Sequence, residues 1–304
     1  MSGPIRTRAN AWPGGALVLL WLTPALWAVN YIVARKAPGV IEPHLLAAGR
    51  WALAALVLTA VAHRELWNHR RLVAAGWREH LVLGALGMLI CGAWVYLGAR
   101  TTSAMNIALI YAASPVLIAL GAVLWLGERF SLRQACGVVL ALAGVIHVIV
   151  QGRWTALGEV QWVAGDGWIV ACMVSWAAYA LLLKHWPSPL SSTARLAVTA
   201  WGGVVTLLPG AFWELSSRAG GAWSIDALAL VVAAALIPGV GAYWAYSHVQ
   251  KALGASRVAA TLYMGPLWGA LAAWGVLGEA LGWHHAMGAA LIIPGIALVT
   301  RRPR

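Results

Sequence analysis

The chain has 304 residues, of which 62% are hydrophobic and only 10% are charged. A soluble domain carries about 25% charged residues, so this composition excludes a protein whose whole surface faces water. The net charge of +12 does not indicate nucleic-acid binding, because the basic residues lie mostly in short loops and at the ends of apolar stretches. The composition predicts an all-α polytopic membrane protein with the lipid bilayer, and no nucleic acid, as a partner.

Apolar stretches of about 20 residues, the length that crosses a bilayer as an α-helix, follow one another along the chain. Proline, glycine and charged clusters separate them, and no loop between them is long enough to form a soluble domain. Many of the 20 tryptophans lie near the ends of these stretches, as is typical of the aromatic belts of membrane proteins. We predict ten transmembrane helices, at residues 14–34, 44–62, 80–99, 103–126, 132–150, 167–186, 192–213, 226–248, 256–277 and 283–300.

The distribution of lysine and arginine predicts the orientation. If the N-terminus is cytoplasmic, the inside segments hold a roughly threefold excess of basic residues over the outside loops. Residues 1–13 and 301–304 are therefore predicted to be cytoplasmic tails of a protein in a bacterial-type plasma (inner) membrane.

Two segments of the sequence are similar to each other. Residues 114–128 read SPVLIALGAVLWLGE, and residues 265–279 read GPLWGALAAWGVLGE. At the constant offset that relates Glu128 to Glu279, Pro115 matches Pro266, and alanines and glycines match on either side. We predict two five-helix repeats, at residues 14–152 and 153–300. Because five is an odd number of spans, the second repeat enters the membrane inverted, as in many secondary transporters.

The fourth helix of each repeat has the same three marks. They are an early alanine pair, a following proline and a closing Leu-Gly-Glu. In the first half the alanines and the proline are Ala104, Ala108 and Pro115. In the second half they are Ala255, Ala259 and Pro266. In these marks the chain resembles the drug/metabolite transporter superfamily, over essentially its whole length, and within it the EamA-type ten-helix exporters. Its aromatic-rich helices most resemble bacterial aromatic amino acid exporters of the YddG type. The resemblance implies a transporter, and says nothing certain about the solute.

A transporter needs polar or aromatic groups at membrane depth, facing a cavity between its halves. Helical spacing places such groups on one face of the first helix, at corresponding places in the sixth and along two turns of the eighth. The predicted substrate-binding residues are Trp27, Asn30, Tyr31, Arg50, Trp94, Tyr96, Asn106, Tyr111, Trp176, Tyr179, Tyr243, Tyr246, Ser247 and Tyr263. The alternative for each aromatic residue is packing or interface anchoring, and for each small polar residue an interhelical hydrogen bond.

Arg50 is the charged residue that lies well inside a predicted span. A guanidinium group there costs several kcal/mol unless it reaches water or a partner. One interpretation is a site for a substrate carboxylate, which arginine binds through two parallel hydrogen bonds. The other is an arginine that extends to the outer surface or pairs with a carboxylate at a helix end.

The sequence predicts an exporter of small amphipathic solutes, with amino acids that carry aromatic or other apolar side chains as the first choice of substrate. Alternatives are a multidrug, organic-cation or other metabolite exporter, and a membrane scaffold that transports nothing. An enzyme is not expected, because Asp166 and Asp226 stand alone and no nucleophile–base pair or metal-spaced histidine set is present. No cofactor, metal or obligatory protein partner is expected. No Asp or Glu lies near the centre of a span, which favours facilitated or weakly coupled export.

Three residue types are given structural roles. The Pro…Gly-Glu pattern predicts a helix end at Glu128 and at Glu279, on opposite faces of the membrane, with a gate contact as the alternative. Gly137 with Gly144, and Gly288 with Gly295, are seven residues apart, so each pair lies on one helix face and permits a close helix approach. Prolines inside the spans are predicted to kink or loosen their helices.

Overall fold

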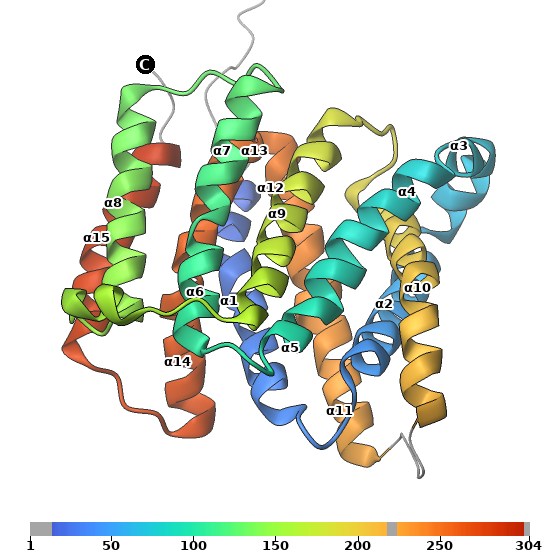
Figure 1. The fold of residues 1–304 in the computed structure, drawn as a ribbon. Helices are drawn as coiled ribbons and strands as arrows, with labels where there is room; N and C mark the ends of the chain where they lie inside the picture. The colour runs from blue at the N-terminus through green and yellow to red at the C-terminus, as the bar shows by residue number, and fades with distance from the viewer. Residues whose placement is uncertain (1–13, 218–223, 301–304) are drawn as a thin grey trace, which may run out of the picture.

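The structure is a computed structural model, and it describes residues 14–217 and 224–300 (Figure 1). The two predicted tails lie outside these residues. The first half of the chain forms α1 (Gly14–Lys36), α2 (Pro43–Asn68), α3 (Arg70–Ala75), α4 (Trp77–Gly84), the π-helical segment η1 (Ala85–Trp94), α5 (Val95–Gly98), α6 (Ala104–Ala112), α7 (Ser114–Leu124) and α8 (Leu132–Ile149).

A 3₁₀ helix, η2 (Trp154–Glu159), connects the halves. The second half forms α9 (Ala164–His185), α10 (Ser192–Ser217), α11 (Ile225–Ala234), the π-helical segment η3 (Ala235–Ala242), α12 (Tyr243–Leu253), α13 (Ala255–Ala260), the 3₁₀ turn η4 (Thr261–Met264), α14 (Gly265–Leu277) and α15 (Trp283–Thr300). All of these elements are helical, as the sequence predicts.

Nine helical segments of the described chain are long and apolar enough to cross a membrane. The remaining predicted span, 256–277, corresponds to the consecutive segments α13, η4 and α14. The largest difference in length is at α2, which runs to Asn68, six residues beyond the predicted end at 62. The prediction ended at the polar residues that begin with His63. A helix continues past an apolar region when its polar turns leave the hydrocarbon, so the charges mark the interface and not the helix end.

The fourth span of each half is broken next to its proline. Helix α6 ends before Ala113, and α7 begins at Ser114 with Pro115 in its first turn. In the second half η4 separates α13 from α14, which has Pro266 in its first turn. Proline has no N–H to donate and clashes with the preceding turn, so a helix restarts at it more easily than it passes through. The third span of each half also contains a matching π-helical segment, η1 or η3. These shared irregularities agree with duplicated halves.

Helices α8 and α15, the last of each half, lie side by side at one edge of the bundle (Figure 1). Their predicted glycine pairs form the contact. A methyl group added at Gly137 would lie 2.6 Å from the Gly295 carbonyl oxygen, and one added at Gly144 would lie 2.9 Å from that of Gly288. The prediction of close approach is confirmed, and it is the two backbones themselves that meet.

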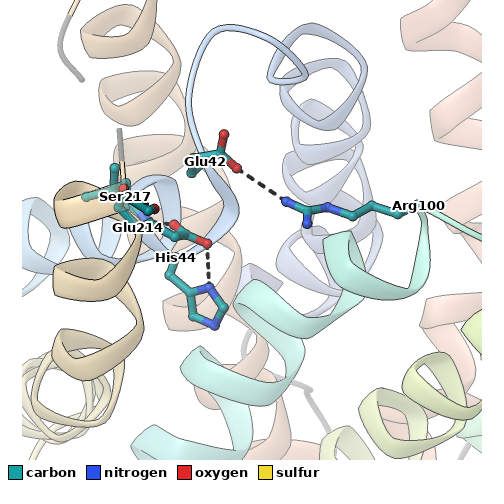
Figure 2. A network of polar contacts seen from close by, with 6 residues as sticks. Glu42, His44, Arg100, Glu214 and Ser217 are labelled. Carbon is teal, nitrogen blue, oxygen red and sulfur yellow. Dashed lines mark hydrogen bonds and ion pairs between the residues drawn. The ribbon is translucent and has the colours of Figure 1, made fainter. Parts of the chain in front are cut away.

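Helices α2 and α10, the second of each half, also pack along each other, and a glutamate ties them at each end. At the end where α1 begins and α15 ends, here called the terminal end, the two carboxylate oxygens of Glu65 accept hydrogen bonds of 2.6 Å from the backbone N–H and hydroxyl of Ser191. At the opposite end Glu214 contacts His44 Nδ1 at 2.6 Å and accepts a 2.9 Å bond from the Leu45 N–H (Figure 2). We call these two contacts the end clamps.

The glutamates of the repeated Gly-Glu pattern lie just after helix ends, as predicted. Gly127 and Gly278 both have left-handed backbones, with φ of 66° and 70°. Each glutamate then reaches the other half of the chain. Glu128 accepts bonds from the backbone of Ala255 and Ser256, at 2.8 and 3.2 Å, at the start of α13. Glu279 lies 2.8 Å from Arg35 at the opposite end of the bundle. Both residues therefore hold the halves together, in addition to ending their helices.

Candidate functional site

Six aromatic rings from four helices meet at the contact between the two halves, and we call them the aromatic cluster. Trp27 of α1 lies 5.3 Å from Trp176 of α9 and 5.5 Å from Tyr246 of α12, between ring centroids. Trp176 stacks on Tyr179 at 5.3 Å, and Tyr243 lies between Trp176 and the ring of Trp51. The cluster consists of Trp27, Trp51, Trp176, Tyr179, Tyr243 and Tyr246. Because both halves contribute rings, a movement of one half against the other changes the contacts between the rings of the cluster.

Arg50 borders the cluster on the side nearer the start of α2. It is only 4% exposed, its guanidinium lies 4.9 Å from the ring centre of Trp51, and it donates a 3.1 Å hydrogen bond to Asn30. Within the described part of the chain, no carboxylate lies within 4.0 Å of it, and its Nε has no hydrogen-bond partner. Arg50 therefore neither extends to the surface nor pairs with a helix-end carboxylate.

A cavity of about 260 Å³ lies on the other side of the cluster, toward the terminal end. Its walls come from the last turns of α9, the first turns of α10 and the last turns of α12. Tyr179 of the aromatic cluster forms part of the lining, and Leu183 and Leu196 add apolar surface beside it. Polar side chains cover the remaining wall: Ser188, Ser192, Thr199, Ser247 and Gln250.

Three basic residues also line this cavity: Lys184, Arg195 and Lys251. Arg195 is 5% exposed and donates to the carbonyl oxygens of Leu183 and Trp186, at 2.8 and 2.5 Å, where α9 ends. Lys251 donates a 2.9 Å bond to the Leu190 carbonyl. These backbone carbonyls accept hydrogen bonds from Arg195 and Lys251, but they carry no net charge and so do not neutralise the two side chains. The cavity therefore combines an aromatic and aliphatic part with a positively charged part.

The predicted site residues divide into those that meet and those that lie elsewhere. Five of them form the aromatic cluster with Trp51, while Asn30 and Arg50 bond beside it and Ser247 lines the cavity. Tyr111 contacts Cys172 and lies close to Tyr243, and Tyr96 lies close to Arg50. Tyr31 lies in α1, but its side chain is outside the described part of the structure.

Three predicted residues are not part of the aromatic cluster. Asn106 donates 2.9 and 3.0 Å bonds to Asp166 and to the Gln161 carbonyl, where it fastens the start of α6 to the start of α9. This is the interhelical bond that the sequence left open as its alternative, and Asp166 is not isolated as the sequence suggested. Trp94 packs against Trp168, at 5.3 Å between ring centroids. Tyr263 is 1% exposed, in a separate core beside α15, and its hydroxyl has no partner among the described residues.

Sequence reasoning missed two residues of this region. Trp51 is fully buried and lies 4.8 Å from Tyr243 between ring centroids, yet it is not among the predicted site residues. Arg195 is near the start of a span, where a basic residue is read as a topology signal. The repeat gave no signal for Arg195, because Arg50 and Arg195 stand at different positions of the second helix of each half, the eighth residue of α2 and the fourth of α10.

The described residues hold no group of three or more His, Cys, Asp or Glu side chains that can bind a metal ion. Two packed five-helix halves, broken spans and an aromatic cluster at their contact define the class of protein as a membrane transporter with duplicated halves. The chain belongs to the EamA-like transporter family, whose model matches residues 15–150 and 163–301, one match per half. This family, within the drug/metabolite transporter superfamily, consists of transporters and not enzymes.

Curated relatives agree with this class. The chain is 27% identical over 88% of its length to an uncharacterized transporter, YyaM, of Bacillus subtilis, of which it covers 87%. It is 26% identical to an uncharacterized transporter of Archaeoglobus fulgidus, over 94% of this chain and 97% of the relative. It is also 26% identical to a probable terminal-alkyne amino-acid exporter of Streptantibioticus cattleyicolor, over 72% of this chain and 71% of that protein.

A solved structure, described only as the crystal structure of a protein, has the same fold. The TM-score is 0.75, and the match covers 94% of this chain and 96% of that chain at 19% sequence identity. At this identity the likeness concerns the fold alone.

Proposed function

We propose that this transporter exports small amphipathic solutes, and that its substrates are amino acids with aromatic or other apolar side chains. It lies in a bacterial-type plasma membrane with both termini in the cytoplasm, and it works by alternating access. The observation that carries the proposal is the buried Arg50, which has no carboxylate partner among the described residues and lies over the ring of Trp51, one of the six rings of the aromatic cluster. An α-amino acid with an apolar side chain has a carboxylate that can pair with Arg50 and a hydrophobic surface that can pack against the aromatic rings.

The composition of the site favours an amino acid over an organic cation. An organic cation would form cation–π contacts with the faces of the tryptophan rings, but the nearby guanidinium of Arg50 would repel it. A relative that is a probable exporter of an unusual amino acid supports the same substrate class. Among aromatic amino acid exporters, those of the YddG type remain the group that the chain most resembles in its aromatic-rich helices.

Counterflow into proteoliposomes tests the substrate class. Purified protein is reconstituted with unlabelled amino acid inside, and uptake of the labelled amino acid is followed for phenylalanine, tryptophan, leucine, aspartate and a cationic dye. We expect accumulation of the apolar amino acids and little accumulation of aspartate. Accumulation of the dye alone would favour the organic-cation exporter, and no accumulation of any solute would favour the scaffold.

Arg50→Ala tests the carboxylate contact. We expect counterflow of phenylalanine to fall by about tenfold or more, because a substrate carboxylate in the site loses its charge-assisted hydrogen bonds. Arg71→Ala is the matched control, since Arg71 is exposed on α3, a helix that contributes no residue to the aromatic cluster. Equal counterflow in the Arg50 variant, with wild-type yield and thermal stability, would contradict the proposed role.

A further inference from the structure

The basic cavity at the terminal end is separate from Arg50 along the axis of the bundle. Tyr243, which lies close to Arg50, and Gln250, which lines the cavity, are seven residues apart on α12. At 1.5 Å per residue this places them about 10 Å apart. The aromatic cluster lies between, with Tyr246 on the same helix and Trp176 and Tyr179 on α9. The molecule therefore has a buried cationic group on each side of one aromatic cluster.

From these positions we propose that the cavity is a second substrate subsite, which binds the carboxylate of the amino acid on the terminal side of the aromatic cluster. It rests on the proposed function and names the part of the substrate that is held there. Arg195, Lys184 and Lys251 supply the positive charge, and the substrate side chain points toward Tyr179. Arg50 and this subsite then present the carboxylate with one charged site on each side of the rings.

Charge is the first reason. Three cationic side chains line one cavity, and among the described residues no carboxylate lies within 4.0 Å of any of them. Glu65 and Glu79 are the acidic groups that act on this region electrostatically, and Glu65 is already engaged by Ser191 in an end clamp. The three cationic side chains outnumber these two carboxylates, so a small anion entering the cavity meets a net positive charge.

Hydrogen-bonding capacity is the second reason. Thr199 is 1% exposed, lines the cavity, and has a hydroxyl with no partner in the described structure. A buried polar atom without a partner is destabilising, so a ligand oxygen that bonds the Thr199 hydroxyl would remove this energetic cost. Gln250 uses its amide nitrogen for a 2.9 Å bond to the Ala180 carbonyl, which leaves the amide oxygen as an acceptor for a substrate ammonium group.

Shape is the third reason. A volume of about 260 Å³ is small for a drug-sized ligand and suits a single amino acid. The aromatic ring of Tyr179 and the side chains of Leu183 and Leu196 line the same space as the lysines. A solute with one charged end and one apolar end matches this distribution, whereas a multiply charged solute would place charge against the leucines.

Binding to the full-length protein in phosphatidylcholine nanodiscs tests the subsite, with L-phenylalanine and L-phenylalaninamide as probes in isothermal titration calorimetry. The amide retains the ring and the ammonium group and lacks the carboxylate. We expect the wild type to bind the acid about tenfold or more tightly than the amide, which is the effect of losing one charge-assisted contact. We expect the double variant Lys184→Gln/Lys251→Gln to reduce this ratio severalfold.

The lysine pair is chosen because both residues are exposed at the rim, so their removal leaves the core intact. Arg195 supports the end of α9, and it is changed only to lysine, which is expected to retain part of the preference for the acid. The control is Arg64→Gln/Arg71→Gln, which removes the same charge from exposed positions of α2 and α3 and is expected to leave the ratio unchanged. An equal preference for the acid in the wild type and the lysine double variant overturns the subsite.

Two further outcomes separate the sources of failure. If the wild type transports phenylalanine and prefers the acid, but the lysine double variant keeps the same preference, the subsite falls and the proposed function stands. If no amino acid is bound or transported, the proposed function falls, and the subsite falls with it. Addition of phosphatidylglycerol to the nanodiscs is expected to leave the affinity for phenylalanine within about twofold of its value in phosphatidylcholine alone. Complete competition by this lipid would show that an anionic headgroup, and not the solute, occupies the cavity.

Discussion

Tyr243 and Tyr246 lie one helical turn apart on α12, and both are buried in the aromatic cluster, but their hydroxyl groups differ. The Tyr243 hydroxyl donates a 2.8 Å hydrogen bond to the Gly87 carbonyl in the π-helical segment η1. The Tyr246 hydroxyl is fully buried and has no partner among the described residues. A satisfied buried hydroxyl contributes to stability, and an unsatisfied one opposes it. The first hydroxyl therefore has a structural role, whereas the second makes no hydrogen bond among the described residues that a substitution would remove.

This difference predicts opposite effects of the same substitution. Tyr243→Phe is expected to lower the free energy of unfolding by about 1 kcal/mol, because it leaves the Gly87 carbonyl without its donor. Tyr246→Phe is expected to be neutral or stabilising. Thermal unfolding of the two purified variants in the same detergent measures the difference, and each serves as the control of the other. Equal losses of stability would show that the Tyr246 hydroxyl is bonded after all.

At the scale of helices, α8 and α15 of the two halves approach so closely that their backbones are in direct contact. Gly137 and Gly144 on α8 face Gly295 and Gly288 on α15, and a methyl group at any of these positions meets a carbonyl oxygen or a side chain within about 3 Å. In a membrane such close approach replaces hydrophobic burial as the source of association, because lipid is as apolar as leucine. The predicted glycine spacing thus has a specific physical use.

Gly144→Ala is expected to destabilise the protein by about 1–3 kcal/mol, the usual cost of overpacking a close contact. The control is Gly275→Ala on α14, where an added methyl group meets nothing within 4 Å. There the exchange is expected to be neutral or to stabilise the helix by up to about 1 kcal/mol. Melting temperatures of the two variants check the prediction. A similar loss at both positions would mean that glycine matters for helix flexibility and not for packing.

The symmetry of the whole molecule is clearest in the end clamps on α2 and α10. Glu65 on α2 holds the start of α10, and Glu214 on α10 holds the start of α2. Each glutamate therefore performs the same task at opposite ends of one antiparallel helix pair. A transporter that opens to one side and then to the other needs contacts at each end that can be broken separately.

We expect Glu65→Ala to shift the population toward a state open at the terminal end, and Glu214→Ala to shift it the other way. A cysteine introduced at Ser247, in a background with Cys136→Ser, reports the change through its rate of labelling by a polar thiol reagent. The other two cysteines, Cys91 and Cys172, donate to backbone carbonyls inside the bundle. We expect labelling to rise by severalfold in the Glu65 variant and to fall in the Glu214 variant. Changes in the same direction would assign the clamps to stability alone.

Much of the candidate site was accessible from the sequence, because helical spacing alone places residues on a common face. Trp27, Trp176, Tyr243 and Tyr246 were selected in this way, and they meet in the structure. Trp51 was missed because a single tryptophan without polar neighbours on its face is read as an anchor or core residue. Asn106 was selected for its polarity, and in the structure it donates its amide to Asp166, the interhelical bond that was the alternative. Its contact with a substrate stays a prediction.

The sequence by itself determined the ten spans, the duplicated halves and the family, because these depend on the hydrophobic length and periodicity of one chain. The same one-dimensional signals identified the helix ends at Glu128 and Glu279. Only the tertiary structure decided which side chains share a space. The basic cavity consists of turns of α9, α10 and α12, and Arg195 is buried there because it bonds carbonyls at the end of another helix. Burial and charge environment arise from neighbours that are distant in sequence, and spacing along one helix does not specify them.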